Sequence, residues 1–394
     1  MTLLARQHRH TGEPVGWQFY GSKKSHASEL PMAAVLFTGF GASIIVLPWI
    51  IVQQVQLTRC SWLSGGTPSG RILSRCSDNS HTVAPVPPGS RSTRRASLSH
   101  LSYLQATVMG ALQGVTELFP VSSLGHSLLV PAWIGGSWSA LVTQQGAKGA
   151  TPFLAFIVAL HVATALALIA YQWRDWVQVL AGIGDLVKDR RIRTPRARLT
   201  ALLIVATIPV GIIGLLLDKP LRHLFSHPLT AAIFLTVNGL VLLTVELLTR
   251  RARRGAHAAA VEPGEAATDY QNVGFAEATL IGSSQALALL PGISRSGVTI
   301  SAGLLRGWSH ERALHFAFLL ATPVILAAGV LKVPELFGPE GKGIGGQVLV
   351  GFVVAFVAAY ISARWLARFL RTRTLYPFVA YCLVAGVVSI VHFA

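Results

Sequence analysis

Long apolar segments are the feature that most constrains how this chain can fold. Downstream of residue 100, six segments each hold about 20 mostly apolar residues, the length that an α-helix needs to cross a hydrocarbon core of about 30 Å. Hydrophobic residues make up 52% of the 394-residue chain and charged residues only 12%, which is too apolar for an ordinary soluble globule. The sequence therefore predicts an all-α integral membrane protein. Its six predicted spans are Pro152–Tyr171, Leu199–Leu217, Leu229–Leu248, Arg312–Leu331, Gln347–Phe369 and Tyr376–His392.

Two further apolar stretches, Leu104–Pro131 and Phe275–Leu305, are broken midway by Pro, Gly and Ser. Backbone without helical hydrogen bonds is tolerated at membrane depth only where protein or a water-filled cavity surrounds it. We therefore expect each stretch to form a re-entrant hairpin, in which a helix, a short polar loop and a second helix return to the side of entry.

The two hairpins resemble each other, which indicates an internal repeat. Each is followed by three predicted spans, so that repeat one covers residues 103–248 and repeat two covers 274–394. Because three spans per copy is an odd number, the second copy must be inverted in the membrane, and the two hairpins would meet near the midplane. The matching positions are Gly110 with Gly282, Gln113 with Gln285, Pro120 with Pro291 and Ser123 with Ser294.

Arginine is concentrated in alternate loops, which predicts the orientation. The loops after the first, third and fifth predicted spans are rich in arginine, whereas the second carries only Lys219 and Arg222 and the fourth only Lys332 and Lys342. By the positive-inside bias the arginine-rich loops are cytoplasmic, and the first hairpin and the C-terminus then face outside. The net charge of +17 thus indicates an orientation against an anionic leaflet and no nucleic-acid partner.

The first hundred residues differ in composition from the rest. Their basic, Ser-, Gly- and Pro-rich sequence cannot bury a core and predicts disorder. Residues 32–57 are apolar enough for an extra span. The alternative is that the working protein begins near Leu101, so that residues 101–394 form the functional membrane domain.

The first hairpin carries polar side chains that need an explanation. Gln113 and Glu117 are four residues apart and share one helix face. A carboxylate inside the bilayer costs at least about 2.5 kcal/mol unless it is paired, hydrated or bound to a cation, which favours a functional role. The structural alternative is that Glu117 caps a backbone amide or pairs with Arg295.

The loop of the first hairpin pairs hydroxyl groups with an imidazole. Ser122 and Ser123 follow a proline and would ordinarily cap the next helix. His126 lies three residues after Ser123, which makes a candidate nucleophile and a candidate proton carrier in one loop. A second histidine, His161, lies within the first predicted span, either as a supporting partner or as a packing residue.

The second hairpin supplies a guanidinium group. Arginine grips phosphate with two parallel hydrogen bonds, and neighbouring glycines let backbone amides approach an anion. The helix that follows would present its N-terminal amides to the same ligand. The predicted phosphate-binding residues are Ser122, Gly125, Ser294, Arg295, Ser296, Gly297 and Thr299. Charge neutralisation, a nucleophile and a proton carrier are the components that phosphoryl transfer requires.

At these positions the sequence resembles the undecaprenyl-diphosphatase family, the bacitracin-resistance type of membrane lipid phosphatase. The motifs that carry the resemblance are QGVTELFPVSSLGH at 113–126 and PGISRSGVTISAG at 291–303, and the likeness runs from about residue 103 to the C-terminus. It implies hydrolysis of undecaprenyl diphosphate at the outer face of the cytoplasmic membrane, which recycles the lipid carrier of cell-wall synthesis. The motif serine, histidine and arginine correspond to Ser123, His126 and Arg295.

The resemblance also implies a divalent cation, Mg²⁺ or Ca²⁺, held by Glu117 and by Gln113, which is the amide version of a position that can be acidic. The resulting hypothesis has Arg295 clamping the diphosphate and either Ser123 or His126 attacking the phosphorus, with His126 alternatively serving as base. The expected partners are a polyprenyl diphosphate lipid and the bilayer, and a homodimer is an open alternative. A polyprenyl-phosphate transporter or flippase is the rival function, because inverted repeats with broken helices are typical of carriers.

Overall fold

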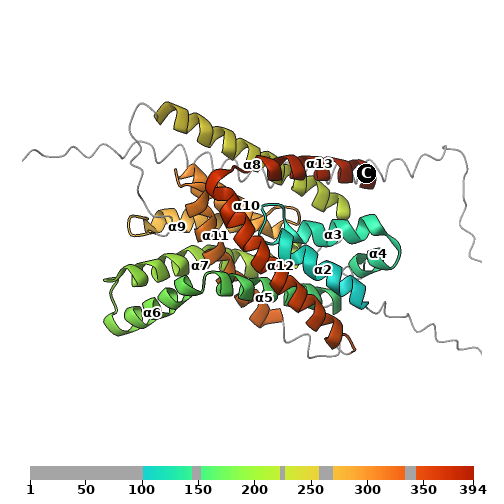
Figure 1. Ribbon diagram of the computed structural model, residues 1–394, viewed down its shortest axis with the longest axis horizontal. Helices are drawn as coiled ribbons and strands as arrows, with labels where there is room; N and C mark the ends of the chain where they lie inside the picture. Colours follow the sequence, from blue (N-terminus) through green and yellow to red (C-terminus); the bar gives the residue numbers. More distant parts are fainter. Residues whose placement is uncertain (1–100, 144–151, 222–226, 257–268, 333–342) are drawn as a thin grey trace, which may run out of the picture. The chain divides into compact units, whose positions relative to one another are not determined.

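The structure is a computed structural model that describes residues 101–143, 152–221, 227–256, 269–332 and 343–394 (Figure 1). Over these ranges the chain is helical and contains no β-strand, so the predicted all-α fold is confirmed. The predictions made for residues 1–100, including the extra span at 32–57, lie outside the described residues. The α-helices are α2 (Tyr103–Thr116), α3 (Ser123–Ile134), α4 (Gly136–Thr143), α5 (Pro152–Tyr171), α6 (Trp173–Asp189), α7 (Pro195–Leu221), α8 (Pro228–Ala256), α9 (Phe275–Ser283), α10 (Arg295–Leu305), α11 (His310–Lys332), α12 (Gly345–Thr372) and α13 (Tyr376–Phe393), with a 3₁₀ helix η3 (Ser284–Leu289).

The long helices match the predicted spans. By length and composition, five helices among the described residues can cross a membrane, and a sixth candidate is the bent pair formed by α5 and α6. Their outward-facing side chains are apolar, as Val391 (77% exposed) and Val330 (75% exposed) illustrate. Such exposure is expected where the surrounding solvent is lipid. The chain is therefore a multi-pass membrane protein.

The segment after the first span differs from the prediction. Residues 172–198 were expected to be a charged loop, but Trp173–Asp189 form helix α6, which turns by 90° from α5. Apolar residues recur every three or four positions along α6, as at Val177, Leu180 and Val187, and all three are exposed. This spacing is typical of an amphipathic helix with one apolar face.

Helices of one repeat pack against helices of the other. Helix α2 lies against α12, and its counterpart α9 lies against α7, while α8 packs against α13. The contacts are close because glycine stands at equivalent positions. A Cβ atom at Gly110 would overlap the carbonyl oxygen of Gly351, and a Cβ atom at Gly282 would overlap that of Ala206. The Gly110 and Gly282 pair noticed in the sequence therefore marks the two equivalent helix crossings.

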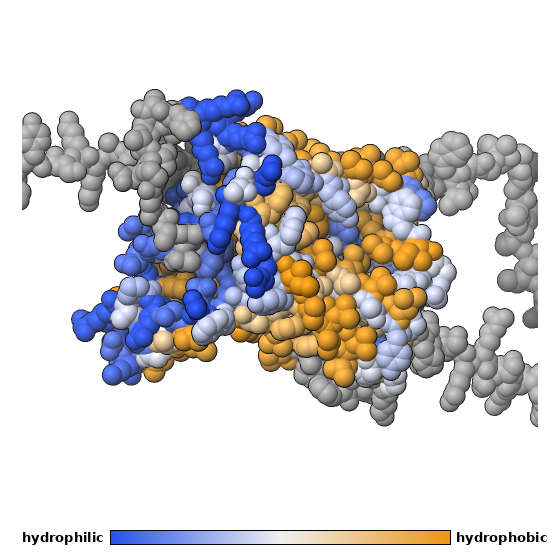
Figure 2. Space-filling view, viewed as in Figure 1, coloured by the Kyte–Doolittle hydropathy of each residue, from blue (hydrophilic) through white to orange (hydrophobic). Residues whose placement is uncertain are grey.

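Hydrophilic residues gather at the ends of the arginine-rich helices. On the face shown in Figure 2 they cover the end of α8, the turn between α12 and α13 with the adjoining part of α12, and the turn between α6 and α7, whereas apolar residues predominate over the other end of α12 and over α13. These are the three segments in which the sequence concentrates arginine. The described part of the chain thus presents its basic loops together.

We predict that Gly110→Ala and Gly282→Ala destabilise the protein. An alanine usually stabilises a helix by up to about 1 kcal/mol relative to glycine, but here the added methyl group meets backbone that cannot rotate away, and overpacking of this kind costs about 1–3 kcal/mol. Thermal unfolding of the purified variants in one detergent measures the effect. Gly211→Ala and Gly214→Ala, which face open space on α7, are the matched controls. Equal melting temperatures for the two pairs would contradict the predicted crossings.

Candidate active site

The two helix breaks contact each other directly. The Ser122 hydroxyl oxygen accepts hydrogen bonds from the Gly125 and Gly292 backbone amides, both at 3.2 Å, and so joins the first loop to the second. Ser122 holds this place with a positive φ of 69°, a conformation that costs a non-glycine residue about 1–3 kcal/mol. Gly292 has φ 109°, and a Cβ there would overlap α8 backbone at Ala231. Only glycine fits that approach.

The side chain of Asn238 on α8 forms hydrogen bonds with the backbone of both loops. Its side-chain amide donates to the carbonyl oxygen of Pro120 at 2.9 Å, and its amide oxygen accepts from the backbone N–H of Ser294 at 3.0 Å. Asn238 is fully buried. One side chain therefore satisfies a backbone group in each break, which is how irregular backbone becomes tolerable inside an apolar bundle.

The Glu117 carboxylate is the centre of the site. It is 9% exposed, and it follows the last residue of α2. Its Oε2 atom accepts a short hydrogen bond from the Ser123 hydroxyl and a second from the Gln113 side-chain amide at 3.1 Å. Its Oε1 atom lies 3.7 Å from Nη2 of Arg295, and Oε2 lies 3.3 Å from Nε2 of His161. The site thus joins Glu117 and Ser123 of the first hairpin to Arg295 of the second.

Two polar atoms at this centre lack a hydrogen-bond partner within the described structure. They are Oε1 of Gln113 and Nη1 of Arg295, and both are buried. A buried polar group without a partner costs about 1–3 kcal/mol, so native proteins keep few of them away from functional sites. One acceptor and one cationic donor are therefore available for a ligand.

His126 is turned away from the carboxylate. Its Nδ1 atom lies 2.6 Å from the Ser122 carbonyl oxygen, and its Nε2 atom lies 2.7 Å from the hydroxyl of Tyr381 on α13. A carbonyl oxygen only accepts, so Nδ1 carries a proton and donates it. In the neutral ring Nε2 then accepts from Tyr381. The structure places His161, instead of His126, beside Glu117.

The hydroxyl groups predicted to bind phosphate have protein partners. Ser294 and Ser296 both donate to the Phe119 carbonyl oxygen, at 3.3 and 3.1 Å, and Thr299 donates to the Arg295 carbonyl oxygen at 2.8 Å. The Ser294 hydroxyl also caps α10 by accepting from the Gly297 amide at 3.2 Å. The two contacts with Phe119 hold the two loops together, and the other two stabilise the start of α10. Their predicted binding role stays a prediction, as does that of Gly125.

Sequence reasoning did not single out Asn238 or Tyr381. Asn238 does carry a signal, because it is a lone amide inside the apolar run FLTVNGLVLL. Tyr381 carries none, since an aromatic side chain within a span is ordinary and its partner His126 lies 255 residues away in the chain.

Taken together, two helix breaks that contact each other inside an apolar helical bundle, with a buried glutamate, serine and arginine beside them, define a multi-pass membrane protein with a buried polar site. Comparison with known proteins agrees with this class. A family model described as Bacitracin resistance protein BacA matches residues 106–388, and the chain belongs to that family.

The matches to three relatives each include nearly the whole length of the relative. An undecaprenyl-diphosphatase of Mycolicibacterium paratuberculosis is 54% identical over 303 residues, which is 75% of this chain and 99% of the relative. Undecaprenyl-diphosphatase 2 of Frankia alni is 48% identical over 341 residues, again 75% and 99%. Undecaprenyl-diphosphatase 2 of Chromobacterium violaceum is 40% identical over 294 residues, 74% of this chain and 98% of the relative.

We predict that Asn238→Leu lowers both stability and activity. The substitution keeps the branching of the side chain but leaves the Pro120 carbonyl and the Ser294 amide buried without the partners that Asn238 gives them, at a cost of about 1–3 kcal/mol for each group. Thermal unfolding in detergent and phosphate release are the measurements. Thr244→Val is the control, because that hydroxyl on the same helix bonds only to the Leu240 carbonyl. An Asn238→Leu variant as stable as this control would refute the bridging role.

Proposed function

We propose that this chain is an integral membrane lipid phosphatase that hydrolyses undecaprenyl diphosphate to undecaprenyl phosphate and inorganic phosphate. Membership of the BacA family supports this, as do relatives named undecaprenyl-diphosphatase that cover three quarters of the chain. The observation that carries the mechanism is the Glu117 carboxylate, which accepts a hydrogen bond from the Ser123 hydroxyl and lies 3.7 Å from Nη2 of Arg295. Nothing in the comparisons favours the transporter alternative.

Arg295 binds the diphosphate in this proposal. Its Nη1 atom is buried without a partner in the described structure, and its Nη2 atom is only loosely paired with Glu117 at 3.7 Å. Both donors can therefore turn to phosphate oxygens with little loss. A guanidinium presents them as a planar fork, which matches two phosphate oxygens.

Ser123 is the proposed nucleophile, with Glu117 as its base. The serine oxygen forms a bond to the terminal phosphorus while the bond between that phosphorus and the bridging oxygen breaks, and the serine proton moves to Glu117. Undecaprenyl phosphate leaves with the bridging oxygen. Water then cleaves the phosphoserine, releases inorganic phosphate and restores the serine.

His126 positions the loop in this scheme. Both of its ring nitrogens are engaged, by Ser122 and by Tyr381, and neither faces Ser123. His161 compensates the charge of Glu117 whenever its ring is protonated. The alternative in which His126 attacks phosphorus needs its ring to leave two hydrogen bonds first.

The oxygen atoms around Glu117 fit a hard divalent cation. Gln113 has a buried side-chain oxygen without a partner in the described structure, one helical turn from the carboxylate. Mg²⁺ and Ca²⁺ prefer such oxygen ligands, and Mg²⁺ commonly takes one or two from the protein and the rest from phosphate and water. When bound, the cation would neutralise charge on the phosphate oxygens.

The membrane location is proposed as follows. The two helix breaks form re-entrant hairpins, and the arginine-rich loops lie on the cytoplasmic side of the cytoplasmic membrane, so that the site opens outward. There the enzyme recycles the lipid carrier of peptidoglycan synthesis and confers bacitracin resistance. The homodimer is a separate prediction, which the mass of the detergent-solubilised protein would test.

We predict that Ser123→Ala abolishes phosphate release and that Glu117→Gln lowers kcat by about 10²- to 10⁴-fold, the usual contribution of a general base. The assay measures inorganic phosphate from undecaprenyl diphosphate with purified protein in detergent, where no gradient exists and a transporter would release none. Ser127→Ala is the matched control, because that buried hydroxyl on the same helix has no partner in the described structure.

Acid quenching of the same reaction identifies the nucleophile. A phosphoserine at Ser123 survives acid and is seen by mass spectrometry, whereas a phosphohistidine at His126 is lost in acid and survives base. An acid-labile, base-stable phosphoenzyme would assign the attack to His126 instead.

We predict that Gln113→Glu tightens cation binding. The substitution replaces the partnerless amide oxygen by a carboxylate and adds one negative charge beside Glu117. Calorimetric titration with Ca²⁺ and the Mg²⁺ dependence of activity should both shift to lower cation concentration. Gln105→Glu, on the same helix but in the capping box at its start, serves as control. Unchanged titration curves would exclude Gln113 from the cation site.

A further inference from the structure

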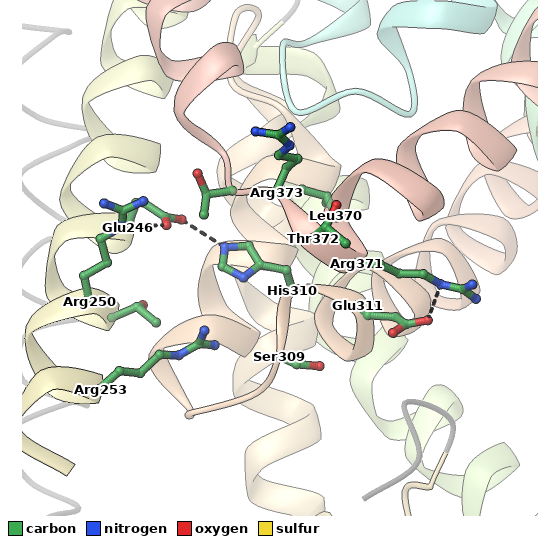
Figure 3. A pocket seen from close by; sticks show the side chains of 12 residues that line it. Glu246, Arg250, Arg253, Ser309, His310, Glu311, Leu370, Arg371, Thr372 and Arg373 are labelled. Atoms are coloured by element: carbon green, nitrogen blue, oxygen red, sulfur yellow. Dashed lines mark hydrogen bonds and ion pairs between the residues drawn. The ribbon is translucent and has the colours of Figure 1, made fainter. Parts of the chain in front are cut away.

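A polar cavity lies away from the candidate active site, at the arginine-rich end of the helices (Figure 3). It has a volume of about 270 Å³ and is formed by the end of α8, the start of α11 and the turn between α12 and α13. One liquid water occupies about 30 Å³, so the cavity has room for a phosphate group and part of its substituent. Helix α10 runs from Arg295 to Leu305, roughly 16 Å at 1.5 Å per residue, and neither Arg295 nor Glu117 lines this cavity.

The lining carries more positive than negative charge. Four arginines line it, Arg250, Arg253, Arg371 and Arg373, against two carboxylates. Both carboxylates already have partners. Glu246 lies 2.9 Å from the His310 ring and 3.4 Å from Nε of Arg250, and Glu311 lies 2.8 Å from Nε of Arg371.

Two of the arginines have no carboxylate partner among the described residues. Arg253 makes one long contact, 3.4 Å to the Trp308 carbonyl oxygen, and extends from α8 toward the turn at Ser309 and His310 (Figure 3). Arg373 follows the last residue of α12 and has no ion pair within the described structure. The cavity therefore offers cationic groups that its own acidic residues do not neutralise.

A buried hydroxyl group supplies an independent indication of a ligand. Thr249 is 7% exposed, lines the cavity, and its Oγ1 atom has no hydrogen-bond partner in the described structure. Leaving such a hydroxyl buried and unpaired destabilises the folded protein. Helix α11 also begins here at His310, so its first-turn amides add partial positive charge.

We propose that this cavity binds the phosphate group of an anion, provided either by an anionic phospholipid headgroup or by free phosphate. Arginine forks and a hydroxyl are the groups that phosphate oxygens accept from. Along α8, two lining residues, Glu246 and Thr249, flank the exposed apolar residues Leu247 and Leu248, on which acyl chains would pack. The competing interpretation is a set of ion pairs at Glu246 and Glu311 that serves stability alone. That set explains Arg250 and Arg371, but it gives no role to Arg253, Arg373 or the Thr249 hydroxyl.

The test compares two double variants that lose the same charge. Arg253→Ala with Arg373→Ala removes the unpartnered arginines, and Arg251→Ala with Arg254→Ala removes two exposed arginines of α8 that do not line the cavity. One arm measures [³²P]phosphate binding to the full chain in detergent by equilibrium dialysis. The other measures, by native mass spectrometry, phosphatidylglycerol retained from nanodiscs of phosphatidylcholine and phosphatidylglycerol. Phosphatase activity reports folding in both, because the variants leave Glu117, Ser123 and Arg295 intact.

We expect the cavity variant to bind roughly tenfold less than the wild type in at least one arm, and the control variant to bind like the wild type. A loss in the dialysis arm assigns free phosphate, and a loss confined to the nanodisc arm assigns the lipid headgroup. Equal binding by all three proteins in both arms would overturn the proposal.

If the cavity variant fails to fold, the Thr249→Val variant tests anion binding by the cavity. Valine keeps the shape and removes only the hydroxyl, so a ligand role predicts weaker anion binding by this active variant. Unchanged binding, with a higher melting temperature from deletion of an unpaired hydroxyl, would also overturn the proposal.

Discussion

The structure depends on how one buried carboxylate is kept charged between two halves of the chain. Glu117 accepts hydrogen bonds from Ser123 and Gln113 close to it in the sequence, but its other neighbours come from elsewhere, the His161 ring from α5 and the Arg295 guanidinium from the start of α10. Ionised groups in an apolar bundle are costly unless paired. The packing that brings α5 and the start of α10 against Glu117 therefore also forms the site.

The same packing supplies hydrogen-bond partners for the backbone groups of the two loops. Breaking a helix inside a bundle frees N–H and C=O groups that lipid cannot satisfy. Here each loop supplies partners to the other, through Ser122 with Gly292 and through Ser294 and Ser296 with the Phe119 carbonyl, and Asn238 bridges both from α8. The hydroxyl groups of Ser122, Ser294 and Ser296 thus hold the two loops together. Among the loop serines of the described structure, only Ser123 donates to the Glu117 carboxylate.

Periodicity and composition could predict the spans, the two interruptions and the pairing of the hairpins, because each leaves a local signal about 20 residues long. The sequence also indicated that Glu117 and Arg295 are neighbours, because a buried carboxylate needs a partner and Arg295 was the candidate for an ion pair. The structure places Oε1 of Glu117 3.7 Å from Nη2 of Arg295. Helix α6 was missed although its apolar spacing is visible, because the arginines nearby suggested a loop. Contacts such as Asn238 with Pro120, 118 residues apart, are set by which helices cross, and no local pattern encodes that.

The geometry around Arg295 explains why the resting site can be stable and still receive a dianion. A tight pair with Glu117 would have to be broken by substrate, at a cost that grows as water is excluded. Nη2 of Arg295 lies 3.7 Å from Oε1 of Glu117, and Nη1 has no partner in the described structure. The carboxylate therefore orients the guanidinium but leaves hydrogen-bond donors free for a ligand. In the proposed mechanism, entry of phosphate would add bonds to Arg295 while raising the local negative charge, and that charge would favour movement of the Ser123 proton onto Glu117. Substrate binding and activation of the nucleophile would thus be coupled through one carboxylate.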